Sequence, residues 1–142
     1  MQNQNIFNFF IVDDDVFCAK MQEQYLLNLN YSNITCFSNG NDCLNNLNQN
    51  PDIIFLDHNM DGITGLEVLK KIKRYNPSIY VIMVSGQQNI YISVAAIEYD
   101  AYDYIIKDNF MYDKMTRIIN KISLVKDELK KLNLPFIQST GY

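Results

Sequence analysis

Three consecutive aspartates end an apolar segment near the start of the chain, in the stretch FFIVDDDVF (9–17). Adjacent carboxylates repel one another, so Asp13, Asp14 and Asp15 are either all solvated or lie close to a positive charge. Carboxylate oxygens are hard ligands, and converging carboxylates with water available suit Mg²⁺. A cation would remove the repulsion, and such a site could support phosphoryl transfer to an aspartate.

Asp57, Ser85 and Lys107 each stand at the end of a later apolar run. An ammonium group and a hydroxyl at neighbouring positions could hold the oxygens of a phosphoryl group. Each residue also has a purely structural explanation. Asp15 is well placed to cap the following helix, Asp57 could form a turn, Ser85 could cap a helix, and Lys107 could lie on the surface.

The elements that must position these residues alternate along the chain. Strands are expected at 6–12, 33–37, 52–56, 78–85 and 102–106. Helices are expected at 15–29, 39–49, 64–74, 88–99 and 110–132. Near-continuous apolar strands, each followed by a helix, indicate an α/β fold with a doubly wound five-stranded parallel sheet covered on both faces. Ligands of such sheets bind beyond the carboxyl ends of the strands, where the polar residues described above lie.

Two helices have apolar rows that predict how they pack. The first helix carries a row at four-residue spacing: Phe17, Met21, Tyr25 and Leu29. The last helix carries a 3-4 pattern: Met115, Ile118, Ile122, Val125, Leu129 and Leu132. It exceeds the length of the sheet by about two turns. This overshoot suggests a coiled-coil-like seam for a homodimer or a lead into an output domain; alternatively, its end packs on its own domain through the tail 133–142.

Composition limits the function classes. With 142 residues, 48% of them hydrophobic, the chain fits one folded domain. A net charge of −4 argues against nucleic-acid binding. No apolar run is long enough for a membrane span, and the N-terminal stretch lacks the features of a secretory signal. Three cysteines fit no zinc-ligand spacing, which favours reduced thiols and a cytoplasmic protein.

Four segments resemble, in order and separation, the signature segments of bacterial two-component response-regulator receiver domains. They are FFIVDDD, DIIFLDHNMDGITGLEVLKKIK, VIMVSG and AYDYIIKDNF. We therefore expect a receiver domain over 1–125, with 126–142 forming the extension of the last helix and a short C-terminal tail. The resemblance implies the strand order 2-1-3-4-5 of flavodoxin-like and chemotaxis-regulator-like three-layer sandwiches.

The resemblance also implies a role for each site residue. Asp57 would be the phosphoacceptor. Asp13 and Asp14 would hold Mg²⁺ together with Asp57 and the backbone carbonyl of Asn59. Lys107 would pair with the phosphoryl group.

Further roles follow from the same resemblance. Ser85 would hydrogen-bond the phosphoryl group, and Tyr104 would move inward with it as the second switch residue. Asn59 and Gln87, two residues beyond the acceptor and the hydroxyl, would tune dephosphorylation. His58, the only histidine, is expected to be an exposed loop residue.

Three residues depart from the family pattern. Asp108 stands where the family usually has a proline preceded by a cis bond, so we expect either a trans bond after Lys107 or a strained cis bond. Asp100 occupies a helix end where glycine is common, and aspartate tolerates the left-handed conformation there. Asp61 replaces a common proline, and we expect a small structural effect.

The function expected from the resemblance is that of a switch without turnover of a separate substrate. A histidine kinase or phosphotransfer protein would phosphorylate Asp57, which would reshape a surface for a downstream protein or output domain; no nucleic acid or membrane would bind directly. One alternative is a small Mg²⁺-dependent phosphatase, whose DxD pattern is contained in DDD. Another is a pseudo-receiver interaction module, which would normally lack the acceptor or the lysine.

Overall fold

The computed structural model describes residues 6–86 and 88–132, and in it five parallel strands form one sheet. The strands are β1 (Asn8–Val12), β2 (Asn33–Phe37), β3 (Ile53–Asp57), β4 (Tyr80–Ser85) and β5 (Asp103–Ile106). The helices are α1 (Val16–Asn28), α2 (Gly40–Asn45), α3 (Gly65–Tyr75), α4 (Ile90–Glu98) and α5 (Met111–Lys131), with a 3-10 turn at Leu47–Gln49. The strand order β2-β1-β3-β4-β5 confirms the expected doubly wound sheet.

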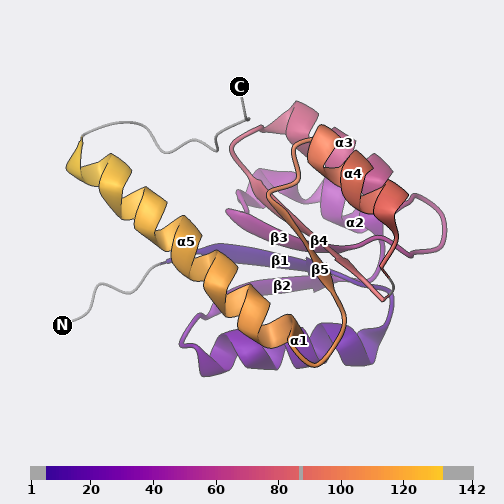
Figure 1. Ribbon diagram of the computed structural model, residues 1–142, viewed down its shortest axis with the longest axis horizontal. Helices are drawn as coiled ribbons and strands as arrows, with labels where there is room; N and C mark the ends of the chain where they lie inside the picture. The colour runs from indigo at the N-terminus through magenta and orange to yellow at the C-terminus, as the bar shows by residue number, and fades with distance from the viewer. Residues whose placement is uncertain (1–5, 87, 133–142) are drawn as a thin grey trace.

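Helices cover both faces of the sheet, so the molecule has three layers (Figure 1). Successive residues of a strand point to opposite faces, and each face of the sheet therefore buries its own set of side chains. Phe9, Ile11 and Phe55 pack on the side of α1 and α5. Phe10 and Leu56 pack on the side of α2, α3 and α4. Burial on both faces explains why the strands read as continuous apolar runs.

Helix α1 turns a different face to the core from the one that its apolar row predicted. Ala19, Gln22 and Leu26 are buried, whereas Phe17 is 71% exposed and Met21 is also exposed. Residues four apart are offset by about 40° around a helix, so a row at this spacing turns steadily around the helix axis. Only the later members of the row pack against the core.

Four helices begin at side chains that accept hydrogen bonds from the backbone of the first turn. Asp15 caps α1, Asn39 caps α2 and Asn89 caps α4. Thr64 and Glu67 form a capping box at the start of α3. Each such cap contributes about 1 kcal/mol, and the prediction that Asp15 is an N-cap is confirmed.

Some boundaries differ from those expected. The helix expected at 39–49 is divided, because α2 ends at Asn45 and a 3-10 turn follows before Asn50 adopts a left-handed conformation (φ 60°). Asparagine has low helix propensity and tolerates the left-handed region, which explains the early end. Strand β3 extends one residue further than expected and includes Asp57.

The departures from the family pattern have ordinary backbone solutions. Asp100 has a φ of 69°, which confirms the left-handed conformation expected there. The bond between Lys107 and Asp108 is trans, since residues 6–86 and 88–132 contain no cis peptide bond.

Helix α5 is longer than the sheet that it covers. Its 21 residues span about 32 Å at 1.5 Å per residue, whereas the strands contain four to six residues and are about 20 Å long or less. The buried residues of α5 end at Ile122, and Leu124 beyond it is 65% exposed. The expected overshoot is therefore confirmed, and the helix end lies beyond the sheet (Figure 1). The alternative in which the tail 133–142 covers this end lies outside the described residues.

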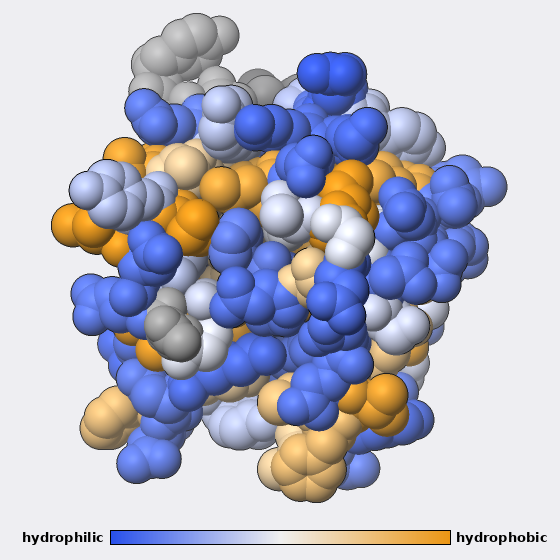
Figure 2. Space-filling model, turned by 90° about the vertical axis from the view of Figure 1, so that its right-hand side faces the viewer, coloured by the Kyte–Doolittle hydropathy of each residue, from blue (hydrophilic) through white to orange (hydrophobic). Residues whose placement is uncertain are grey.

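The surface is polar with separate apolar groups. Figure 2 shows a face that is largely hydrophilic, with hydrophobic residues gathered at its upper left and along its lower edge. Within the described part of the chain, no helix has both the length and the apolar character needed to cross a membrane.

Candidate functional site at the carboxyl rim of the sheet

The carboxyl ends of the strands form one rim of the sheet, and backbone hydrogen bonds continue past the strand ends there. The N–H of Asp13 donates to the last carbonyl of β2 at 3.0 Å. The N–H of His58 donates to the carbonyl of Val84 at 3.1 Å, and that of Lys107 to the carbonyl of Ser85 at 2.8 Å. These bonds hold the residues that follow β1, β3 and β5 in fixed register with the strands beside them.

Three carboxylates, which we call the acidic cluster, meet at this rim: Asp13, Asp14 and Asp57. One oxygen from each lies within 4.8 Å of the others. Asp13 is 2% exposed and Asp57 is 4% exposed, while Asp14 lies at the exposed side. Because water screens the two buried carboxylates poorly, their mutual repulsion is stronger than it would be on a surface.

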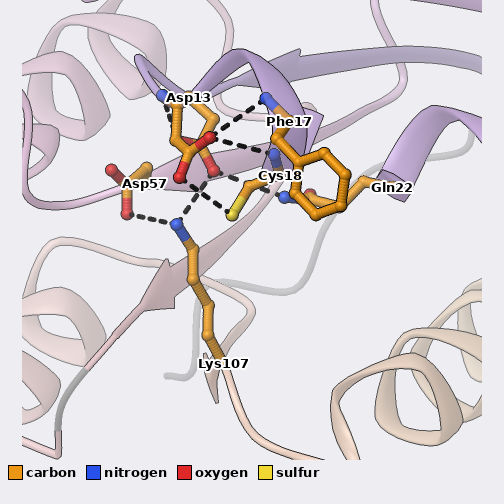
Figure 3. A network of polar contacts seen from close by, with 7 residues as sticks. Asp13, Phe17, Cys18, Gln22, Asp57 and Lys107 are labelled. Atoms are coloured by element: carbon orange, nitrogen blue, oxygen red, sulfur yellow. Dashed lines mark hydrogen bonds and ion pairs between the residues drawn. The ribbon is translucent and has the colours of Figure 1, made fainter. Parts of the chain in front are cut away.

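Lys107 reaches the acidic cluster from the end of β5. Its Nζ lies 2.9 Å from Oδ2 of Asp13 and 3.4 Å from Oδ1 of Asp57 (Figure 3). The side chain is mostly buried, so the interpretation of Lys107 as an ordinary surface lysine is wrong. One ammonium group cannot neutralise three carboxylates, and the cluster keeps a net negative charge when all three are ionised.

Burial and charge shift the ionisation of both partners of this ion pair. Burial raises the pKa of Asp57 to about 6; Lys107 opposes this shift, and the charges of Asp13 and Asp14 add to it. Burial lowers the pKa of Lys107, but the hydrogen bond to Asp13 and the charges of Asp57 and Asp13 outweigh it, so the pKa lies above its ordinary value. The lysine is therefore a permanent cation at neutral pH.

Asp15 follows Asp13 and Asp14 in sequence but does not belong to the cluster. Its Oδ1 accepts hydrogen bonds from the N–H groups of Phe17 and Cys18 at the start of α1. These hydrogen bonds lower the pKa of Asp15, and the bond from the Cys18 N–H has the largest effect. The run of three aspartates is thus divided between two tasks, because the chain turns from strand to helix within it.

The hydroxyl and aromatic residues lie on the strands next to the acidic cluster. Ser85 ends β4 and is buried, and the cap of the following helix is Asn89, so the helix-cap alternative for Ser85 is wrong. Tyr104 is half-buried on β5, opposite Met83 of β4, and packs against the apolar layer on the side of α3 and α4.

The loop after β3 contains two further residues considered in the sequence. Asn59 is exposed two residues beyond Asp57. His58 is half-buried, which corrects the expectation of an exposed loop residue, and burial lowers its pKa. Its main-chain bond to β4 holds it against the sheet. Gln87 lies outside the described residues.

Two residues that shape the site were missed by sequence reasoning. Gly65, the first residue of α3, lies so close to the β3 end that a Cβ atom would come within 2.6 Å of the carbonyl oxygen of Asp57. Gln22 is a buried polar residue on the inner face of α1, and its Nε2 lies 3.5 Å from Oδ2 of Asp13. A polar residue at helical spacing from Ala19 and Leu26 was a usable signal, but the apolar row of α1 predicted a different buried face.

The donor set of the acidic cluster fits Mg²⁺. Its carboxylate oxygens are hard ligands close enough to share one cation, and the exposed position of Asp14 leaves access for water, which Mg²⁺ retains. The excess of negative charge at the cluster favours a bound cation. The residues present are therefore suited to the metal.

This fold and this site together define a class. A parallel sheet of this strand order is the fold of CheY-like receiver domains, and here it carries an acidic cluster and a lysine at its carboxyl rim. A CheY-like receiver protein from Methanospirillum hungatei superposes with a TM-score of 0.77 at 24% identity, covering 87% of this chain and 99% of that one. At this identity the likeness concerns the fold.

The family model described as response regulator receiver domain matches residues 9–120, and the chain belongs to this family. The chain is 31% identical over 134 residues to the DNA-binding transcriptional regulator NtrC of Klebsiella pneumoniae. The match covers 93% of this chain and 28% of that protein. The sensory transduction protein LytR of Staphylococcus epidermidis is 34% identical over 123 residues, or 84% of this chain and 47% of that protein. The chain thus spans less than half the length of either relative.

Among solved structures, the receiver domain of NtrX from Brucella abortus gives a TM-score of 0.73 at 29% identity. The match covers 80% of this chain and 96% of that one. The chain accordingly corresponds to the receiver portion of such regulators.

Proposed function

We propose that Asp57 accepts a phosphoryl group from a histidine kinase or a histidine phosphotransfer protein, and that this controls a protein-interaction surface. The observation that carries the proposal is the meeting of Asp13, Asp14 and Asp57 with Lys107 at one rim. In the transfer, the P–N bond of a phosphohistidine breaks and an O–P bond to a carboxylate oxygen of Asp57 forms. The imidazole nitrogen that leaves takes up a proton from solvent.

Mg²⁺ would be held by Asp13, Asp14 and Asp57, with the backbone carbonyl of Asn59 as a further ligand. When bound, it would neutralise negative charge on the oxygens of the transferring group. The residues of the chain supply the remaining parts. Lys107, which is charged at neutral pH, would pair with a phosphoryl oxygen, and Ser85 would donate its hydroxyl to another.

Ser85 and Tyr104 would connect the phosphoryl group to the surface. Their position supports this role, because they belong to the neighbouring strands β4 and β5 and each lies at or near the rim. Movement of Ser85 toward the phosphoryl group would leave room for the Tyr104 ring, and the surface of α4 and β5 would change. Asn59 and Gln87 would set the lifetime of the phosphoryl group through the access of water.

The downstream partner in this proposal is a protein or an output domain, and the chain acts in the cytoplasm without binding nucleic acid itself.

Homodimers would form through the end of α5, where Leu124, Val125 and Leu132 are exposed on a helix that has passed the sheet. A concentration-dependent dimer in sedimentation that is lost in Leu132→Ser is the result expected from this surface. A monomer at all concentrations would remove the dimer from the proposal.

The phosphatase alternative finds less support in the site. It needs Asp13 and Asp15 as the two acids of a DxD pattern, yet Asp15 is engaged at the start of α1. Asp57 would then have no assigned task, although it lies in the acidic cluster. We therefore propose a phosphoacceptor without turnover of a separate substrate.

The experiment is to add Mg²⁺ with beryllofluoride, a phosphoryl mimic, and to record backbone-amide NMR spectra. We expect shifts around Asp57, Ser85 and Tyr104 in the wild type and none in Asp57→Asn. Asp127→Asn, which removes the same charge from the exposed side of α5, serves as the matched control and should respond like the wild type. Intact mass after incubation with acetyl phosphate should show one added phosphoryl group in the wild type and none in Asp57→Asn. An unchanged wild-type spectrum would overturn the proposal.

A further inference from the structure

A buried glutamine lies directly behind the acidic cluster. Gln22 is 2% exposed and occupies the inner face of α1 between Ala19 and Leu26, which are both apolar and buried. Its Nε2 lies 3.5 Å from Oδ2 of Asp13, and the amide points from the helix toward this carboxylate (Figure 3). Glutamine is rarely enclosed in this way unless its polar atoms are used.

The charge of Asp13 determines which way the amide of Gln22 is turned. With the opposite orientation, Oε1 would face a carboxylate oxygen, and two acceptors would repel each other. In the observed orientation Nε2 donates, while Oε1 is buried with no hydrogen-bond partner among the described residues. The side chain thus satisfies Asp13 at the expense of its own carbonyl oxygen.

The hydrogen-bond donors to the carboxylate of Asp13 differ in how firmly they are held in place. Its Oδ1 accepts from the backbone N–H of Asp15 at 2.9 Å, and its Oδ2 accepts from Lys107 at 2.9 Å and from Gln22 at 3.5 Å. The ammonium group of Lys107 is at the end of a long flexible side chain and also contacts Asp57. Gln22 is enclosed in the core, so its amide has less freedom to move away from Oδ2 than the lysine ammonium has.

We infer that Gln22 is a positioning residue, which holds the carboxylate of Asp13 in the orientation that a divalent cation requires. The inference rests on the proposed function, in which Asp13 takes part in holding Mg²⁺ and Lys107 turns to the phosphoryl group. Groups that hydrogen-bond to metal ligands from behind fix the orientation of those ligands, and their loss typically weakens metal affinity by about 10–100-fold. Gln22 acts through Asp13 and has no contact with the metal itself.

The test compares Gln22→Met with Gln24→Met. Methionine matches the length of glutamine without a donor, and Gln24 lies on the exposed side of the same helix, where it bonds to Asn28. Titration with Mg²⁺ alone, followed by amide NMR, should give a dissociation constant about tenfold higher for Gln22→Met than for the wild type. Gln24→Met should bind Mg²⁺ as the wild type does.

Two further readouts separate positioning from a general structural role. In the absence of metal, Gln22→Met should unfold at the wild-type temperature or above it, because the buried unpaired Oε1 is removed. In an Asp13→Asn background, Gln22→Met should change the Mg²⁺ dissociation constant by less than about twofold, since the two residues act as one unit.

The outcomes distinguish this inference from the proposed function. If the wild type shows no response to Mg²⁺ or beryllofluoride, the proposed function fails. If the wild type responds and Gln22→Met binds Mg²⁺ with unchanged affinity, the inference alone is overturned. Loss of folding in Gln22→Met would also contradict it, because a stable fold would then depend on the amide.

Discussion

Uncharged residues decide how closely the charged ones of this site can meet. Gly65 lets the first turn of α3 lie against the backbone of the β3 end, which carries Asp57. Gln22 holds Asp13 from the opposite side of the sheet edge. The positions of the two buried carboxylates therefore depend on neighbours that bear no charge and that would not participate in the chemistry.

The close approach at Gly65 gives a direct stability test. A Cβ atom there would lie 2.6 Å from the carbonyl oxygen of Asp57 and 2.6 Å from the Cα of His58, and backbone atoms cannot move aside as a flexible side chain can. We expect Gly65→Ala to lower the free energy of unfolding by about 1–3 kcal/mol in urea denaturation. A Cβ at Gly86 meets nothing within 4 Å, so Gly86→Ala is the control and should remain within about 0.5 kcal/mol of the wild type. Equal stability of the two variants would show that the β3–α3 contact is looser than described.

Among the secondary-structure elements, α5 has two parts with different surroundings. Up to Ile122, one side of the helix is packed in the apolar layer with α1 and the sheet. Beyond that residue, Leu124, Val125 and Leu132 are exposed while Leu129 is half-buried, because the helix has passed the end of the sheet. The first part contributes to the stability of the domain, and the second is available for a partner.

Alanine substitutions on the two parts of α5 should separate these contributions. Ile122→Ala removes fully buried methyl and methylene groups, and we expect a loss of about 2–4 kcal/mol in the free energy of unfolding. Leu124→Ala, two residues further and 65% exposed, should change it by less than about 0.5 kcal/mol. Urea denaturation of both variants at low protein concentration provides the comparison. A comparable loss in Leu124→Ala would mean that this side chain is covered.

For the molecule as a whole, the buried carboxylate of Asp57 opposes folding when it is ionised and no cation neutralises it. The pKa of Asp57 in the folded protein is about 6, against an ordinary value of 3.8, so the folded state favours the protonated form. The stability associated with this proton is fully present below about pH 4 and is lost as the pH rises through about 6. The difference between these two pKa values corresponds to a loss of at most about 3 kcal/mol in the free energy of unfolding at neutral pH.

This linkage predicts how Asp57→Asn should behave in the absence of metal. At pH 7 we expect the variant to be more stable than the wild type by about 1–2 kcal/mol, since it removes a buried charge. The difference should shrink toward zero near pH 4, where Asp57 of the wild type is protonated. Urea denaturation across this pH range measures it, with Asp127→Asn as the charge-matched control that should show no such trend. A difference that did not depend on pH would contradict the raised pKa.

Mg²⁺ should reverse this order of stabilities. A ligand that binds only the folded state stabilises it by mass action. Wild-type protein should therefore gain more from Mg²⁺ than Asp57→Asn does, and the same denaturation series with added Mg²⁺ provides that comparison.

The amino-acid sequence alone was sufficient for the sheet and for the position of the acidic cluster. Apolar runs mark buried strands, and the direction of the chain places Asp13, Asp57, Ser85 and Lys107 after strands that must end at the same rim. The strand order and the separate tasks of the site residues came from the resemblance to receiver domains. These features depend on local sequence patterns, which do not change with the details of side-chain packing.

Only the tertiary structure decided which face of α1 is buried, that Gln22 lies behind Asp13, and that Lys107 bridges Asp13 and Asp57. It also decided that His58 is half-buried and that the packed part of α5 ends at Ile122. Each of these depends on contacts between segments far apart in the chain, and a helical row of apolar residues is compatible with more than one rotation of the helix. Long-range packing selects among rotations that the local pattern leaves nearly equal.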